Sequence, residues 1–264
     1  MRRHLIRIYN ILVMTGIDPV KLIRAIRGVP FYLRDLREFK AQQNESAITF
    51  KLGKAWPCFG DRHADGGVAS GHYFHQDLLV ARRIHNSNPN KHVDVGSRID
   101  GFVSHVASFR EIEIFDIRPI LVPVPNIKFV QCDLMESVDG ALVDCCDSIS
   151  CLHALEHFGL GRYGDPVKYD GYIDGLNNLY KILKQNGMLY LSVPIGDQRI
   201  EFNAHRVFSI RYLLSLFRNK YEIIEFSYVD DNGDLHENVS LDSEINNENF
   251  GCTYGCGIFE LRKK

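Results

Sequence analysis

Between residues 92 and 195, short apolar runs alternate with segments that have room for helices. The runs have the length and the apolar content of buried strands, and they read "HVDVG", "IEIFDI", "IKFVQCD", "DSISCL" and "MLYLSVP". Helices are expected over "YFHQDLLVARRIHN", from Phe102 to about Phe109, and from about Asp170 to Lys184. Strands that alternate with helices in this way predict an α/β protein whose mainly parallel sheet has helices on both faces.

The end of the chain departs from this alternation. Two further strand-like runs, "YEIIEFSYVD" and "YGCGIFELRK", are separated by the polar segment "DNGDLHENVSLDSEINNEN". That segment has no room for a well-packed crossover helix, which two parallel neighbours would require. The two runs are therefore expected to pair with each other in an antiparallel fashion.

The first 56 residues are expected to form a helical extension ahead of an α/β domain over residues 57–264. Apolar residues recur at helical spacing in a first helix, at Leu5, Ile8, Ile11 and Leu12. A second amphipathic helix is expected to begin at Asp18 and to be ended by Gly28 and Pro30. The extension is interpreted either as a cap or dimer contact, or as a basic surface that lies on an anionic membrane.

Composition excludes several classes of protein. The formal net charge of −2 gives no global attraction to nucleic acid. The seven cysteines lack the paired CxxC spacing of a zinc site, and several stand in apolar runs, where cysteine acts as a small hydrophobic residue. No stretch of about 18 uncharged apolar residues predicts a spanning helix. We therefore expect a reduced, cytoplasmic protein, with peripheral contact at the inner membrane left open.

Acidic residues stand at the ends of three consecutive predicted strands. In doubly wound sheets, ligands bind beyond the carboxyl ends of the strands. Gly96 lets the backbone approach a ligand closely, Asp116 is placed to accept hydrogen bonds from both ribose hydroxyls, and Asp133 is placed to hold an adenine amino group. The set predicts a nucleotide-type cofactor bound by Asp94, Gly96, Ser97, Asp116, Ile117, Cys132, Asp133 and Leu134.

From Tyr73 to Lys264 the chain resembles a class I S-adenosylmethionine-dependent methyltransferase. The resemblance is carried by "DSISCLHALEHFG", in which the fourth strand leads into "LEH", and by "LYKILKQNGMLYLSVPIG", in which a helix and a glycine turn precede the fifth strand. It implies a Rossmann-like, seven-stranded, mainly parallel sheet with an antiparallel C-terminal strand. It also implies S-adenosyl-L-methionine as the cofactor and methyl transfer as the activity, with His153 facing the cofactor.

Two stretches, "HALEHFGLGRYGDP" and "FNAHRVFS", resemble more narrowly a little-studied methyltransferase-like family whose bacterial members occur with surface-polysaccharide biosynthesis. This resemblance implies a sugar hydroxyl of a glycan or nucleotide-linked sugar as the methyl acceptor. The missing regular GxGxxG argues against another enzyme on the same sheet, such as a nucleotide-sugar reductase.

The glycine turn departs from the family's pattern. Glycines are common two, four and six positions after the first acid, whereas this chain has Gly96, Arg98 and Asp100 there, with Gly101 one step late. Arg98 is expected to bind the carboxylate of the methionine portion. The alternative is a catalytically inactive methyltransferase-like module that acts as a partner in a polysaccharide-assembly complex.

Methyl transfer to a hydroxyl needs a positioned acceptor and one base near neutral pKa, and histidine suits that role. The candidates at this edge of the sheet are His153, His157 and His205. The preferred base is His205, with His157 as the alternative and Glu156 placed to orient one of them. The residues expected to contact the acceptor are Arg162, Tyr163, Asn203 and Arg206.

The segment "YFHQD" is expected to cover the cofactor, with His75 and Gln76 at its methionine portion. No metal is predicted, although a metal site is an open alternative in a cluster of His63, Asp65, His72, His75 and Asp77. The expected partner is a sugar or glycan acceptor and not nucleic acid. Peripheral membrane contact through the N-terminal helices and assembly into a homo-oligomer are left open.

Overall fold

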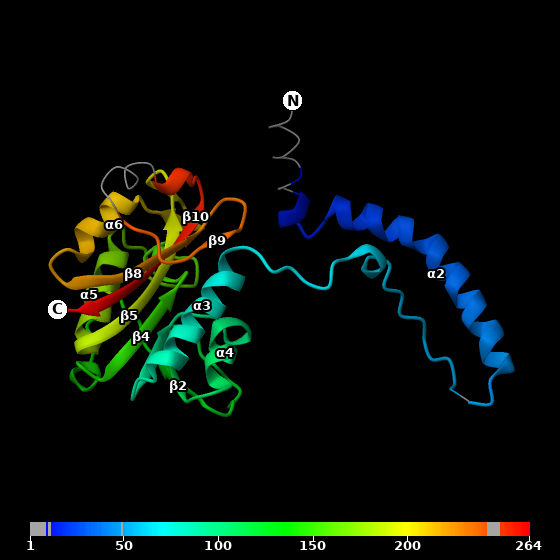
Figure 1. The fold of residues 1–264 in the computed structure, drawn as a ribbon, viewed down its shortest axis with the longest axis horizontal. Coiled ribbons are helices and arrows are strands. Elements are labelled where there is room, and N and C mark those ends of the chain that lie inside the picture. Colours follow the sequence, from blue (N-terminus) through cyan, green and yellow to red (C-terminus); the bar gives the residue numbers. More distant parts are fainter. Residues whose placement is uncertain (1–8, 10–11, 49, 242–248) are drawn as a thin grey trace. The chain divides into compact units, whose positions relative to one another are not determined.

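The protein was analysed as a computed structural model that describes residue 9 and residues 12–48, 50–241 and 249–264. Two compact units make up the chain, Met1–Val68 and Ala69–Lys264 (Figure 1). Most of the first predicted helix, including Leu5, Ile8 and Ile11, lies outside the described residues, and Leu12 is helical. No helix in the described part of the chain is long and apolar enough to cross a membrane.

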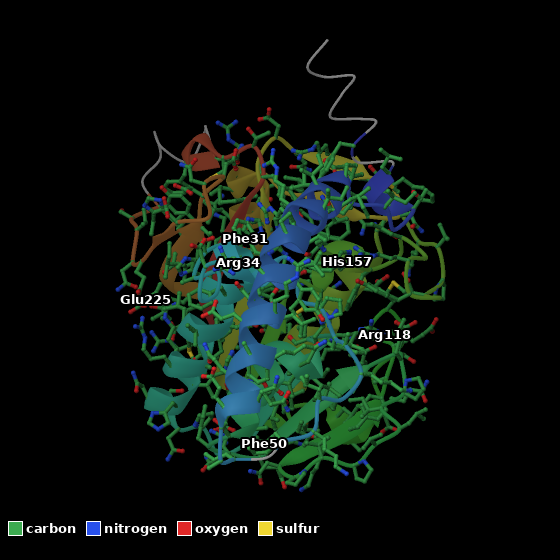
Figure 2. All side chains as sticks on the ribbon, turned by 90° about the vertical axis from the view of Figure 1, so that its right-hand side faces the viewer. Phe31, Arg34, Phe50, Arg118, His157 and Glu225 are labelled. Atoms are coloured by element: carbon green, nitrogen blue, oxygen red, sulfur yellow. The ribbon has the colours of Figure 1, made fainter. Side chains whose placement is uncertain are left out.

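The N-terminal unit contains the long helix α2 (Pro19–Glu45) and the short 3-10 turn η1 (Asp61–His63). The Asp18 carboxylate caps α2 by accepting hydrogen bonds from the first backbone N–H groups, as its position before Pro19 predicts. The predicted end at Gly28 and Pro30 is wrong, because the helix continues through both. Good helix formers follow Pro30, including Leu33 and Arg34, and Arg34 lies over the ring of Phe31 (Figure 2).

Residues after the predicted boundary at 56/57 belong to the N-terminal unit. The ring of Phe59 meets Tyr32 edge-on at 5.6 Å, and Arg62 pairs with Asp35, so this segment packs back on α2. At Gly28 an added Cβ would lie 2.5 Å from the Phe59 carbonyl oxygen, which explains why a glycine is needed inside the helix. The structure places the boundary after Val68 for this reason.

The Ala69–Lys264 unit is built on an eight-stranded sheet in the order β3-β2-β1-β4-β5-β10-β8-β9 (Figure 1). The strands from β3 to β5 run parallel, and β10 runs antiparallel between β5 and β8, as predicted. The predicted seven strands are present, and a two-residue strand is added at the edge. The bounds are β1 (His92–Val95), β2 (Ile112–Asp116), β3 (Ile127–Gln131), β4 (Cys146–Leu152), β5 (Leu183–Ile195), β8 (Tyr221–Val229), β9 (Leu235–His236) and β10 (Gly255–Lys263).

Helices cover both faces of this sheet. On one face, α5 and α6 pack in a core that includes Leu179, Phe217 and Phe259, and on the other, α3 and the turn before α4 pack in a core that includes Ile84 and Phe102. The bounds are α3 (His72–Ser87), η2 (Ile99–Val103), α4 (Ser104–Ala107), η3 (Gly140–Leu142), η4 (Leu155–His157), α5 (Gly171–Ile182) and α6 (Ile210–Phe217).

A hairpin and a helix after β5 were not predicted from the sequence. A small separate hairpin, β6 (Arg199–Glu201) and β7 (His205–Val207), follows β5, and α6 follows the hairpin. The hairpin turn contains Asn203 at a φ of +64°, and α6 is capped by the Ser209 hydroxyl. The hairpin brings residues 199–207 beside the carboxyl end of the parallel strands, because β7 contacts both η4 and β5.

Truncating the side chain of Phe259 tests whether the antiparallel strand β10 anchors the core. This side chain is fully buried and meets the rings of Phe217 and Phe226 at 5.2 and 4.7 Å. Phe259→Ala is expected to lower the free energy of unfolding in urea by about 3–5 kcal/mol. Phe202→Ala is the control, because Phe202 is 73% exposed and should change stability by less than about 0.5 kcal/mol. Equal losses in the two variants would contradict this packing.

Candidate active site

A pocket opens at the carboxyl ends of β1, β2, β3 and β4. Its walls combine apolar side chains with a few acidic and basic ones, which is typical of a small-molecule site. Of the predicted residues, the structure brings together in its lining Gly96, Asp116, Ile117, Cys132, Asp133, Leu134, His153, His157 and Tyr163. The three strand-end segments therefore meet at one edge, as the alternation of strands and helices predicts.

The turn after β1 depends on Gly96. Its φ of +75° lies in the left-handed region, and an added Cβ would lie 2.9 Å from the Cβ of Ala154. The Asp94 carboxylate is fully buried and accepts hydrogen bonds from the backbone and hydroxyl of Ser97 and from the hydroxyl of Ser150. Burial raises the pKa of Asp94 to about 6. Asp94 therefore positions the turn and does not line the pocket, which corrects its predicted contact with the cofactor.

Asp116 ends β2 in the pocket wall, as predicted, but its carboxylate is already paired. The guanidinium of Arg118 donates to both of its oxygens, at 3.0 and 2.7 Å, and also lies 4.5 Å above the ring of Tyr163. Arg118 lies on the same side of the unit as His157 and lines the same pocket (Figure 2). Arg118 was not among the predicted site residues. The signal that could have identified it is a cation two residues after a strand-end acid.

The segment after β3 supplies another wall of the pocket. Leu134 is buried, Cys132 is half-buried, and burial raises the pKa of the Cys132 thiol, so it presents a neutral, weakly polar surface. The Asp133 carboxylate accepts a hydrogen bond from the backbone of Met135 at 2.8 Å and keeps its other oxygen for a ligand. Met135, which also lines the pocket, was missed because its position follows from this tight turn.

Arg98 does not reach this pocket. Its guanidinium pairs with Asp100 at 2.6 Å, and the side chain is 76% exposed. Arg98 instead lines an adjacent, larger hollow with Ser97 and the start of α3, including Gln76. His75 lines neither hollow, which is at odds with its predicted contact with the cofactor.

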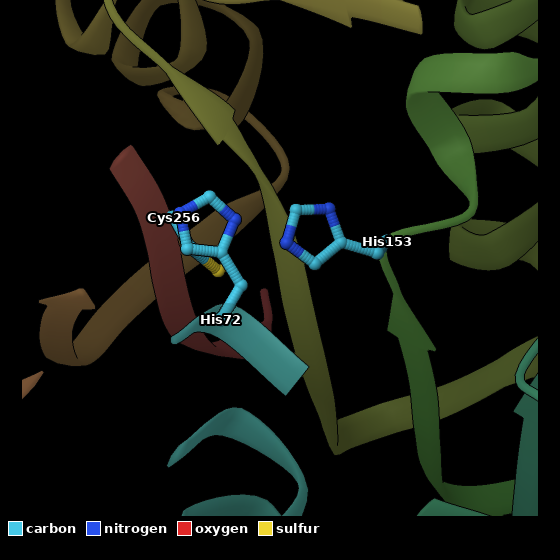
Figure 3. Close-up of side chains that lie close together, drawn as sticks. All are labelled: His72, His153 and Cys256. Carbon is cyan, nitrogen blue, oxygen red and sulfur yellow. The ribbon is translucent and has the colours of Figure 1, made fainter. Parts of the chain in front are cut away.

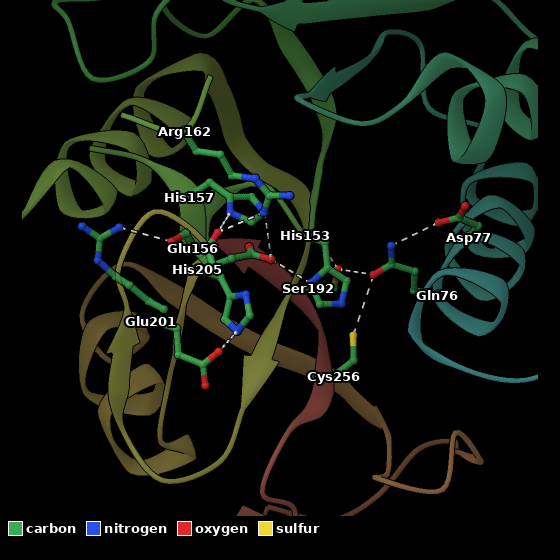
Figure 4. Close-up of polar contacts among 12 residues, drawn as sticks. Gln76, Asp77, His153, Glu156, His157, Arg162, Ser192, Glu201, His205 and Cys256 are labelled. Carbon is green, nitrogen blue, oxygen red and sulfur yellow. Dashed lines mark hydrogen bonds and ion pairs between the residues drawn. The ribbon is translucent and has the colours of Figure 1, made fainter. Parts of the chain in front are cut away.

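A buried acid lies between two histidines after β4 (Figure 4). Glu156 is 1% exposed, and its Oε1 lies 2.7 Å from His153 Nδ1 and 3.7 Å from His157 Nε2. Although burial opposes the charged form, Cys256 and Glu156 hold the pKa of His153 well above its usual value. Burial also opposes ionisation of Glu156, but His153 lowers the pKa of that carboxyl below its usual value. The geometry is that of a buried carboxylate and imidazolium pair.

His157 has the opposite character. Burial lowers the pKa of His157 below its usual value, despite the nearby Glu156 carboxylate. Its Nδ1 lies 2.6 Å from the carbonyl oxygen of Ala204, so Nδ1 carries the proton and donates it there. The Nε2 lone pair is thereby left free, because 3.7 Å to Glu156 is too long for a hydrogen bond. His157 can therefore accept a proton.

His205, the preferred base from the sequence, lies apart from both hollows. Its Nε2 lies 3.2 Å from Glu201, and its ring is 5.0 Å from that of Tyr254 (Figure 4). It lines neither of the two hollows described above. The hairpin of β6 and β7 turns it towards Glu201, which sequence reasoning could not foresee because the hairpin was not predicted. Of the two histidines predicted as the base, His157 lines the pocket and His205 does not.

The predicted acceptor contacts separate into two groups. Arg162 and Tyr163 lie at the rim, where Arg162 donates to the Ala204 carbonyl at 3.0 Å and lines the larger hollow. Arg206 is buried and donates to the backbone carbonyls of Glu156, Phe158 and Tyr169. Its predicted contact with the acceptor is therefore replaced by a structural role. Asn203 is exposed in the hairpin turn and lines neither of the two hollows.

The order and direction of the strands define a Rossmann-like sheet of the type found in class I methyltransferases. The 1,6-didemethyltoxoflavin-N1-methyltransferase of Burkholderia thailandensis, solved with S-adenosylhomocysteine, is similar at a TM-score of 0.50 and 15% identity, covering 72% of this chain and 78% of that one. The [4+2]-cyclase SpnF is similar at a TM-score of 0.51 and 14% identity, covering 72% and 80%. These likenesses establish the fold.

The comparisons of sequence say less about this chain than the comparisons of structure. A family described as a Caenorhabditis protein of unknown function, DUF268, matches residues 130–254, which run from the end of β3 almost to β10. The comparison with curated proteins gave no match.

Asp77 at the larger hollow should make stability depend on pH. Burial raises the pKa of Asp77 from 3.8 to about 6, so the native state binds more protons than the unfolded state between these values. The contribution of Asp77 to the free energy of unfolding is therefore expected to fall by up to about 3 kcal/mol as pH rises from 4 to 7. Asp77→Asn should show a smaller fall in the free energy of unfolding over that range. The control Asp100→Asn changes an exposed acid and should leave the fall intact; an unchanged slope in Asp77→Asn would contradict the assignment.

Proposed function

We propose that the Ala69–Lys264 unit is an S-adenosylmethionine-dependent methyltransferase whose cofactor site is the pocket at the carboxyl ends of β1 to β4. The observation that carries the proposal is that Gly96, Asp116 and Asp133, from the ends of three consecutive strands, line this one pocket. A glycine turn and two strand-end acids in this order match the needs of an adenosine group with an attached amino acid.

The residues present fit this cofactor. Asp116 would hold the ribose hydroxyls, and the apolar walls at Ile117 and Leu134 would enclose the adenine ring, with the free oxygen of Asp133 at its amino group. When bound, the cofactor supplies an electrophilic methyl group on a sulfonium. The turn at Gly96 keeps side-chain atoms away from the pocket wall, which allows close approach of a ligand to the backbone.

His157 is the base in this proposal. Its neutral ring lines the pocket, its Nδ1–H is fixed by the Ala204 carbonyl, and its Nε2 accepts the proton of the acceptor hydroxyl. Glu156, 3.7 Å from Nε2, stabilises the imidazolium that results. The proton ends on His157 as the acceptor oxygen becomes nucleophilic.

A sugar hydroxyl of a glycan or nucleotide-linked sugar is the proposed acceptor. The rim supports a hydroxylated or anionic ligand, since Arg118, Arg162 and Tyr163 lie there beside the larger hollow. Arginines grip phosphate with paired donors, and tyrosine rings pack on sugar faces. The narrow sequence resemblance around "HALEHFGLGRYGDP" points to the same class of acceptor.

A non-catalytic module is the second candidate, and one observation favours it: the Asp116 carboxylate is already satisfied by Arg118. Such a module would act as a partner in a polysaccharide-assembly complex. Helix α2 suits contact with a membrane surface or another protein, since it has no buried residue and carries exposed Leu22 and Ile26 beside Arg24 and Arg27.

Asp116→Asn is the test of the cofactor site. Loss of the carboxylate removes charge-assisted hydrogen bonds to the ribose, each worth about 1.5–3 kcal/mol, so affinity for S-adenosylhomocysteine should fall by about 10–100-fold. Isothermal titration calorimetry measures the change. Asp100→Asn is the matched control and should bind as the wild type does. Wild-type affinity in Asp116→Asn would overturn the proposed site, and no binding by the wild type would favour the non-catalytic module.

His157→Gln is the test of the base. It should lower turnover by about 10²–10⁴-fold while leaving affinity for S-adenosylhomocysteine unchanged, with label transfer to a panel of nucleotide sugars and glycans as the assay. Because the pKa of His157 lies below its usual value of 6.5, the neutral form persists into mildly acidic solution, and the wild-type rate should be half-maximal at a pH below 6.5. His205→Gln is the control and should keep most of the turnover; the reverse pattern would restore His205 as the base.

A further inference from the structure

Three side chains that bind transition metals come together from segments far apart in the sequence (Figure 3). His72 begins α3, His153 follows β4, and Cys256 is the second residue of β10. One donor atom from each lies within 4.8 Å of the others. Cys256 is fully buried and His153 is 7% exposed, whereas His72 is partly exposed, so two of the three side chains are shielded from water.

One nitrogen of the His153 imidazole is oriented by an acceptor outside the cluster. Nδ1 of His153 bonds to the Glu156 carboxylate at 2.7 Å, and the ring of His72 stacks on the ring of His153 with the ring centroids 5.1 Å apart. Nε2 of His153 is buried and makes no well-formed hydrogen bond, and the group beside the ring is Cys256. A carboxylate that fixes one ring nitrogen while the other faces a cluster of donors is the arrangement around zinc-binding histidines.

Charge balance points the same way. The Glu156 carboxylate is buried and needs a positive charge close by, because an isolated buried charge is costly. The nearest side chain able to face that charge is His153, whose Nδ1 lies 2.7 Å from the carboxylate. A divalent cation held by the Cys256 thiolate and two neutral imidazoles would supply the positive charge. The cation, the thiolate and the Glu156 carboxylate would then sum to zero charge.

We propose that His72, His153 and Cys256 form a binding site for Zn²⁺ in the wall of the candidate active site. Two nitrogens and a thiolate select zinc over Mg²⁺ or Ca²⁺, which prefer oxygen. Donor atoms around a tetrahedral zinc lie about 3.5 Å apart, so the cluster must contract by about 1 Å on binding. His153 lines both hollows, so the metal would lie behind the surface that contacts the ligands.

A metal site that includes His72 was an open alternative from the sequence, but the other ligands in the structure are different residues. His72 is a ligand, but its companions are distant in the chain, and neither His75 nor Asp77 takes part. The proposal does not depend on methyl transfer, because its evidence is the donor set and its test is metal binding.

Metal content and cobalt spectroscopy test the proposal on the full-length protein without any methyl donor. Protein produced with zinc should retain close to one zinc per chain after gel filtration, measured by inductively coupled plasma mass spectrometry. Replacing zinc with Co²⁺ should give a thiolate-to-cobalt charge-transfer band and intense visible bands of tetrahedral geometry. Wild-type protein that retains no zinc, or a cobalt form without the thiolate band, would overturn the proposal regardless of how any variant folds.

Variants locate the site. Cys256→Ser and His72→Asn should each weaken zinc binding by more than about 100-fold, since loss of an outer-shell partner alone costs about 10–100-fold. Glu156→Gln should weaken zinc binding by about 10–100-fold. The matched controls are Cys252→Ser, a buried thiol four residues earlier, and His75→Asn, one turn along α3, and both should bind zinc as the wild type does. A thiolate band that survives in Cys256→Ser and disappears in Cys252→Ser would place the metal elsewhere and refute the site.

Discussion

The Glu156 carboxylate is buried at the end of β4, and its need for compensating charge organises the residues around it. His153 meets it at 2.7 Å, and His157 lies on its other side. The backbone carbonyl of Glu156 accepts a hydrogen bond from Arg206, which also donates to the backbone carbonyls of Phe158 and Tyr169. A single short turn after β4 thus fixes the pocket wall, because moving it would leave both a buried acid and a buried guanidinium without partners.

The same carboxylate separates the two histidines by function. His153 is in direct contact, and its pKa is held well above its usual value, whereas His157 is farther away and burial lowers its pKa below the usual value. Two titratable groups whose environments drive their pKa values apart are the usual basis for assigning an acid and a base. Here the ring with the lowered pKa is the one that faces the ligand pocket with a free lone pair, and the ring with the raised pKa is the one that faces Cys256. Proton acceptance and cation binding are therefore assigned to different rings.

The strands and the antiparallel ending were predictable, because apolar runs and the length of the segments between them are local properties of the sequence. The meeting of Gly96, Asp116 and Asp133 followed from the same pattern, since carboxyl ends of parallel strands share an edge. The position of His205 was not predictable, because it depends on the hairpin of β6 and β7. Neither was the grouping of His72 with Cys256, which are 184 positions apart in the sequence and meet only through packing of α3 beside β10. Helix α2 continued through Pro30 because one lost hydrogen bond is a small part of a 27-residue helix.

Arg118 links the cofactor pocket to its rim. Its guanidinium donates to both oxygens of Asp116 and at the same time lies over the ring of Tyr163. A ribose that binds Asp116 must share those oxygens with Arg118 or displace it, and displacement would also remove the cation from the Tyr163 ring. Because Tyr163 belongs to the rim that borders the proposed acceptor hollow, cofactor binding at Asp116 as proposed would be coupled to the arrangement of this rim through Arg118. The cation that the sequence places at Arg98 thus has a counterpart at Arg118, two residues after Asp116 rather than within the glycine turn.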